Sequence, residues 1–153
     1  MRIPILLGLA ALLCAGAAYS DDKSGNDAGA AAQLVGTYRI TAGEKFGVKE
    51  PADRVKDVSV RFTAGEVYIT DKDKKQVYAA SYKLDTSQKP WKITMVSTLA
   101  ATVGQRSDGL IEKTGDTVRL IYALPGGEMP TDLRHTKDKQ LMFVMKAVDK
   151  EKK

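Results

Sequence analysis

The chain has 153 residues, of which 43% are hydrophobic, 28% charged and 7% aromatic. This length and composition are typical of one globular domain and exclude a disordered or collagen-like chain. The formal net charge is +5, but lysines alternate with aspartates, as in Lys137-Asp138-Lys139, so no stripe of one sign indicates a nucleic-acid-binding surface.

The first twenty residues have the pattern of a secretory signal peptide. Arg2 supplies the basic start, an apolar run follows over 3–13, and small residues over 15–20 precede Asp21. We therefore predict export, to the periplasm or beyond the cell. Asp21 is expected as the first mature residue, and Ala15-Gly16-Ala17 offers a second cleavage site. Lipidation at Cys14 is disfavoured because Leu13 is bulky, and the run is too short for an integral membrane anchor, which needs about 20 apolar residues.

Signal removal takes away Arg2 and the only cysteine, so the net charge falls from +5 to +4 and no disulfide can form. A chain of this size can bury a sufficient core unaided. Small and polar residues over 21–32 predict a flexible leader that ends in a helical turn running into Gln33 and Leu34. The domain is expected over 33–148, with a charged tail over 149–153.

Within the domain, apolar side chains recur at every second position, which is typical of half-buried antiparallel strands. In chain order, strands are expected over 35–42, 56–63, 66–71, 76–84, 91–97, 107–113, 117–123 and 140–147. Turn residues such as Ala64-Gly65 and Thr114-Gly115-Asp116 separate them, and a helical turn is expected over 51–55. The pattern predicts an all-β, antiparallel fold of about eight strands. An up-and-down barrel is favoured over a two-sheet sandwich because closure removes exposed edges.

Alternation also predicts which side chains face the barrel interior. The residues that would line an internal ligand site are Tyr38, Ile40, Val60, Phe62, Ile69, Tyr82, Trp91, Ile93, Met95, Tyr122 and Phe143. Val58, Val67, Leu120 and Met145 share the same face. These side chains either surround a cavity or fill the barrel as a solid core, since an eight-stranded barrel permits both.

Catalytic and metal-binding patterns are weak. The only histidine, His135, lies between Arg134 and Thr136 in a polar stretch and is expected to be solvated. A Gly-x-Ser-x-Gly elbow is absent, and one histidine cannot supply a zinc site. Asp71-Lys72-Asp73 lacks the later ligands of a calcium loop. We therefore expect no enzymatic activity, no metal and no cofactor.

Several short segments together resemble a lipocalin-like domain family of unknown function that is abundant among small exported planctomycete proteins. They are Leu34-Val35-Gly36-Thr37-Tyr38, Tyr82-Lys83-Leu84-Asp85, Lys89-Pro90, Gly109-Leu110-Ile111-Glu112, Gly115-Asp116-Thr117-Val118, Pro125-Gly126 and Pro130-Thr131. The similarity covers about 33–146. Tyr38 replaces the usual first-strand tryptophan, and Met129 replaces a usual arginine.

The resemblance implies a lipocalin-like barrel, and it implies that Lys146 of the last strand covers Tyr38. It is compatible with two functions. One is the binding of a small apolar ligand inside the barrel. The other is a solid domain that binds an envelope protein through its surface or loops. The long connections over 43–56, 98–107 and 125–139 are expected at one barrel end, as entrance or contact surface.

Overall fold

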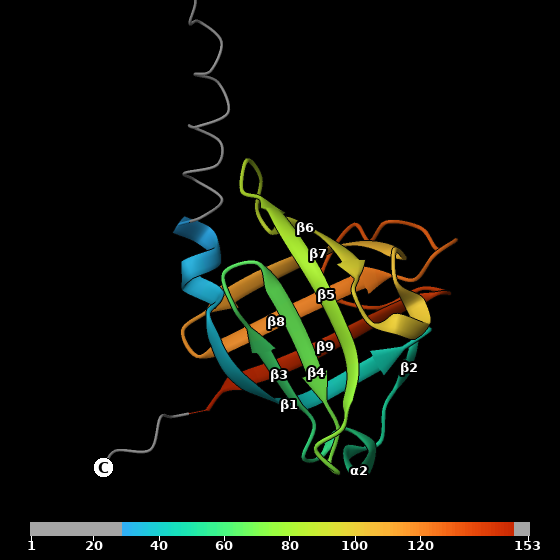
Figure 1. Cartoon of the computed structure of the whole chain (residues 1–153). Helices are drawn as coiled ribbons and strands as arrows, with labels where there is room; N and C mark the ends of the chain where they lie inside the picture. Colours follow the sequence, from blue (N-terminus) through green and yellow to red (C-terminus); the bar gives the residue numbers. More distant parts are fainter. Residues whose placement is uncertain (1–28, 149–153) are drawn as a thin grey trace, which may run out of the picture.

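The structure is a computed structural model that describes residues 29–148 (Figure 1). The expected signal peptide, most of the expected leader and the expected tail over 149–153 lie outside these residues. Nine antiparallel strands form one sheet in the order β2-β1-β3-β4-β5-β6-β7-β8-β9, and pairing of β1 with β9 closes it. The prediction of an all-β, antiparallel barrel is confirmed: eight strands close, and β2 is added beside β1.

The strands agree closely with the period-two pattern. They are β1 (Gly36–Lys45), β2 (Val48–Lys49), β3 (Ser59–Phe62), β4 (Glu66–Thr70), β5 (Gln76–Asp85), β6 (Trp91–Ser97), β7 (Arg106–Thr114), β8 (Thr117–Ala123) and β9 (Gln140–Ala147). The main differences are that β1 continues through a segment expected to be a connection, that β2 was not expected as a strand, and that β3 begins three residues later than expected. Gly43, Glu44 and Lys45 pair with Phe143, Met142 and Leu141 of β9, so distant pairing overrides the polar local sequence.

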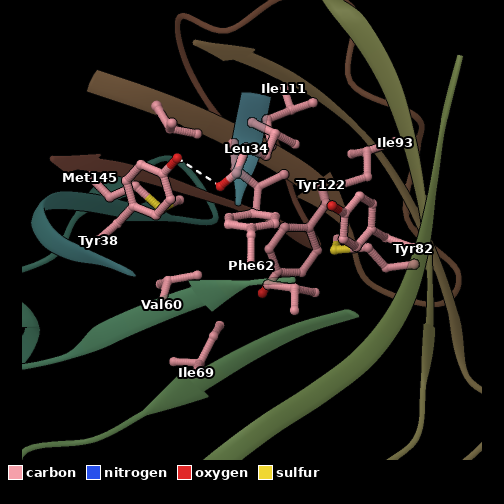
Figure 2. Packing of buried hydrophobic residues seen from close by; sticks show 14 of the residues in the cluster. Leu34, Tyr38, Val60, Phe62, Ile69, Tyr82, Ile93, Ile111, Tyr122 and Met145 are labelled. Atoms are coloured by element: carbon pink, nitrogen blue, oxygen red, sulfur yellow. Dashed lines mark hydrogen bonds between the residues drawn. The ribbon is translucent and has the colours of Figure 1, made fainter. Parts of the chain in front are cut away.

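Three helical segments lie within residues 29–148. Residues 29–34 are helical, α2 (Ala52–Val55) lies where a helical turn was expected, and the 3₁₀ helix η1 (Ala100–Thr102) follows β6. In the first of these, Ala30, Ala31 and Leu34 are buried in the core. The Tyr38 hydroxyl donates a hydrogen bond to the Leu34 carbonyl at 2.8 Å (Figure 2). The packed domain therefore begins before the boundary expected at Gln33.

The antiparallel order gives the barrel two unlike ends (Figure 1). At the closed end lie the helical segment 29–34 and the short turns 63–65, 86–90 and 115–116. At the loop end lie the longer connections 46–58, 98–105 and 124–139. The expectation that the long connections share one end is confirmed.

One part of the outer wall is covered. Leu110 and Ile121 face outward, because their neighbours along the strands point into the core, yet both are buried. They lie in one cross-strand row with Met142 and Glu44. Since Thr136 binds Glu44, the connection 124–139 is held against this row. β8 is therefore apolar on both faces, because one face packs in the core and the other lies under the connection 124–139.

Candidate functional site

Most of the residues expected to line an internal ligand site are deeply buried. Those with little exposed surface are Tyr38, Ile40, Val60, Phe62, Ile69, Tyr82, Ile93, Met95 and Tyr122. Trp91 and Phe143 are partly buried and pack against the same cluster. The structure therefore brings all eleven expected residues together in and around one core. Figure 2 labels several of them, among them Tyr38, Phe62 and Tyr82.

The packing of this core is close. Phe62 is in edge-to-face contact with Tyr38 at 5.8 Å and with Tyr82 at 5.6 Å between ring centroids. Ile93 of β6 and Val118 of β8 have no exposed surface at all. A cavity of ligand size would leave part of the surface of its lining side chains uncovered, so these side chains have neighbours on every side. The closed half of the barrel is filled by its own residues.

The buried tyrosines have their polar atoms satisfied. The Tyr82 hydroxyl donates to the Thr63 carbonyl at 2.7 Å. Burial, followed by the nearby Tyr38, raises the pKa of Tyr82 to about 12. Burial also raises the pKa of Tyr122, with a smaller effect from Tyr78. These phenols stay neutral at physiological pH.

The interior is less tightly covered toward the loop end. The rings of Tyr78 and Tyr122 stack with their centroids 6.5 Å apart, and the centroids of Tyr122 and Phe143 are 6.3 Å apart. Tyr78, Leu141 and Phe143 are only partly buried. Trp91 lies at the opposite, closed end, where β6 begins.

The resemblance implied that Lys146 covers Tyr38, and this prediction is wrong. Tyr38 pairs with Ala147, which faces inward, so Lys146 faces outward and pairs with Arg39. Lys113 of β7 lies over the Tyr38 ring instead. Its ammonium lies 6.0 Å from the Tyr38 ring centroid and donates to the Gln33 carbonyl at 2.7 Å.

The turn between β1 and β2 presents an aromatic side chain to solvent. Phe46 is 40% exposed and Val48 is 68% exposed. Both turn residues have positive φ, 51° at Phe46 and 85° at Gly47. Asparagine is the usual first residue of such two-residue turns, because it tolerates positive φ. Phenylalanine is strained in this left-handed region. A strained, exposed residue of this kind is a candidate for function.

The same turn is held firmly. The Phe46 N–H donates to the Gln140 carbonyl at 3.0 Å, and the Gly47 N–H donates to the Thr136 hydroxyl at 2.6 Å. The Lys45 ammonium lies 5.3 Å from the Phe46 ring centroid. Phe46 is therefore displayed on a fixed support, as binding residues need to be.

A buried carboxylate anchors that support. Glu44 is 8% exposed and accepts hydrogen bonds from the Thr136 N–H and, at 2.8 Å, from the Thr136 hydroxyl. Burial by itself raises the pKa of Glu44, but the Thr136 hydrogen bonds and the adjacent His135 together lower it below its ordinary value. Glu44 thus ties the connection 124–139 to β1 and the Phe46 turn. Its role was not predicted, because residues 44 and 136 share no local pattern.

His135 is solvent-exposed, as expected from its polar neighbours. Its side chain is 83% exposed, with Nδ1 3.5 Å from Glu44. Among residues 29–148, no cluster of three histidine, cysteine or acidic side chains is arranged to hold a metal ion. In the same part of the chain, no helix has the length and apolar character needed to span a membrane.

A scan against protein-family models found no match, and searches of curated proteins and of solved structures found none. The resemblance to lipocalin-like domains therefore stays a prediction.

Proposed function

We propose that this chain is an exported interaction domain, with a lipocalin-like barrel as its solid scaffold. A protein partner in the cell envelope receives Phe46 in an apolar pocket. The observation that carries the proposal is the exposed Phe46 ring, held at a positive φ of 51° on a turn that two hydrogen bonds fix to the barrel.

Two further features support this assignment. The close packing of the closed half leaves the outer surface and the loop end as the places where a partner can bind. Val103, on the connection 98–105, is a third exposed apolar side chain at the loop end, at 68%. Exposed apolar side chains on fixed loops are typical of protein contact surfaces.

Phe46→Asn separates binding from folding. Asparagine tolerates positive φ, so we expect the free energy of unfolding to stay the same or rise by up to about 1 kcal/mol, as when strain in a turn is relieved. Partner binding should fall by at least about tenfold, because a central aromatic anchor carries much of an interface's affinity. Urea unfolding measures the first quantity.

Site-specific photocrosslinking measures the second. A benzophenone side chain at position 48 should give a discrete crosslinked product in the organism that encodes the chain, and Phe46→Asn should abolish it. Lys83, exposed on the outer wall of β5, provides the control position, where no such product is expected. Equal crosslinking at both positions, or a product at position 48 that survives Phe46→Asn, would refute the proposal. A crosslinked product of twice the chain's mass would show that the partner is a second copy of this chain and not an envelope protein.

Binding of a small apolar ligand is the second candidate. Partial exposure of Tyr78, Leu141 and Phe143 toward the loop end favours it. Such a ligand would bind over the core and not within it, since Met95 and Ile93 deeper in the barrel have almost no exposed surface.

A further inference from the structure

A groove of about 840 Å³ lies at the closed end, away from the Phe46 turn. It runs along the start of β1, the end of β3 and the end of β9. Tyr38 and Phe62 form part of its lining, and the exposed aliphatic side chains of Val35 and Val148 border it. Its volume lies within the range of about 300 to 1,000 Å³ that is typical of small-molecule sites.

The charged residues of the groove all have the same sign. Arg61 and Lys113 line it, and its lining within the described part of the chain contains no acidic residue. Lys113 uses one N–H to bind the Gln33 carbonyl, which leaves two donors of its ammonium group for other acceptors. Arg61 forms no ion pair within residues 29–148.

The adjacent outer wall strengthens the positive field. Arg39 lies directly opposite Lys146 in the β1–β9 pair, and Arg61 lies one diagonal step from Arg39 in the β1–β3 pair. Like charges placed directly across a strand pair repel each other and destabilise the sheet. An anion bound beside them would relieve that repulsion.

We propose that the groove binds an amphipathic anion with a single apolar chain, such as a free long-chain carboxylate. The apolar chain lies along Val35, Ala147 and Val148. The carboxylate binds Arg61, whose planar guanidinium matches it with two parallel hydrogen bonds, within the field of Lys113. A concave groove with one short row of cations fits a single dissolved molecule and not the flat surface of a bilayer.

The test is calorimetric titration of the chain from Asp21 onward with dodecanoate below its micellar concentration. Saturable binding of one molecule is expected. Dodecanol should bind at least about tenfold more weakly, and dodecyltrimethylammonium should not bind, because the site selects negative charge. Absence of dodecanoate binding, or equal binding of all three probes, would overturn the proposal.

Variants and chemical shifts locate the site. Arg61→Gln should weaken dodecanoate binding about tenfold, whereas Arg119→Gln, an exposed cation of β8 outside the groove, should leave it unchanged. Amide shifts should change over 35–38, 61–64 and 147–148. Equal effects of the two variants, or shifts confined to Tyr78, Leu141 and Phe143, would contradict the assignment.

Two further experiments distinguish the groove from a membrane-binding surface and from the Phe46 turn. Vesicles of anionic phosphatidylglycerol should not retain the chain in sedimentation, and retention without dodecanoate binding would assign the surface to a membrane and overturn the proposal. Phe46→Asn should bind dodecanoate as the wild type does, so failure at the groove and failure of the protein-binding assignment are distinguishable.

Discussion

Replacing Phe62 by alanine should lower the free energy of unfolding by about 3 to 5 kcal/mol, the cost typical of removing a buried aromatic ring. Phe62 is 1% exposed and contacts both Tyr38 and Tyr82 edge to face. Because these rings are fixed by hydrogen bonds to Leu34 and Thr63, they cannot move to fill the space. Urea unfolding followed by circular dichroism measures the change.

Phe46→Ala is the matched control, because it removes the same ring from an exposed position. Its effect on the free energy of unfolding should stay within about 0.5 kcal/mol. A loss below about 1.5 kcal/mol for Phe62→Ala would show that the centre of the barrel is loosely packed.

Glu44→Gln should lower the free energy of unfolding by about 1 to 2 kcal/mol at pH 7, since it replaces a charged acceptor of two hydrogen bonds with a neutral one. The pKa of Glu44 is lowered in the folded state, so its contribution is fully present above the ordinary value of 4.5. The contribution is lost as the pH falls from 4.5 through the lower, folded-state pKa. Wild type and variant should therefore converge in acid. Urea unfolding at a series of pH values follows this difference.

Glu128→Gln is the control for that series. Glu128 lies on the same connection but is 79% exposed, in a 3.8 Å contact with Lys137. Such exposed pairs contribute little, so the change should stay within about 0.5 kcal/mol at every pH. Parallel pH profiles for Glu44→Gln and wild type would show that the Glu44 carboxylate does not anchor the connection 124–139.

The strands were predictable because their signal is local. Ile93 and Met95 alternate with Lys92 and Thr94, and the bounds of β6, β8 and β9 match the expected ranges. The end of β1 was not predictable in this way. Glu44 and Lys45 become strand residues through pairing with Met142 and Leu141, almost a hundred positions later in the sequence, and with Lys49 and Val48 of β2, which was not predicted as a strand.

The same distinction applies to the candidate site. The inward faces followed from alternation, so the expected interior residues lie together. The strained turn at Phe46 carries a weak sequence signal. Gly47 suits a turn, but phenylalanine is not a turn residue, and the β1–β2 pairing places positive φ on it. Lys113, and not Lys146, lies over Tyr38 because Lys146 is on the outward face of β9. A shift of one residue in strand register reverses which face a side chain is on, so the sequence did not determine this contact.

Crystals of the domain under xenon pressure test most directly whether the barrel is a solid scaffold. Xenon binds in dry apolar cavities, and Phe62→Ala, which creates such a cavity, provides the positive control. The packing around Phe62, Ile93 and Val118 requires that the wild type binds no xenon in its interior, whereas Phe62→Ala binds it beside residue 62. Xenon among these three residues in the wild type would contradict the solid barrel and return the ligand site to its interior.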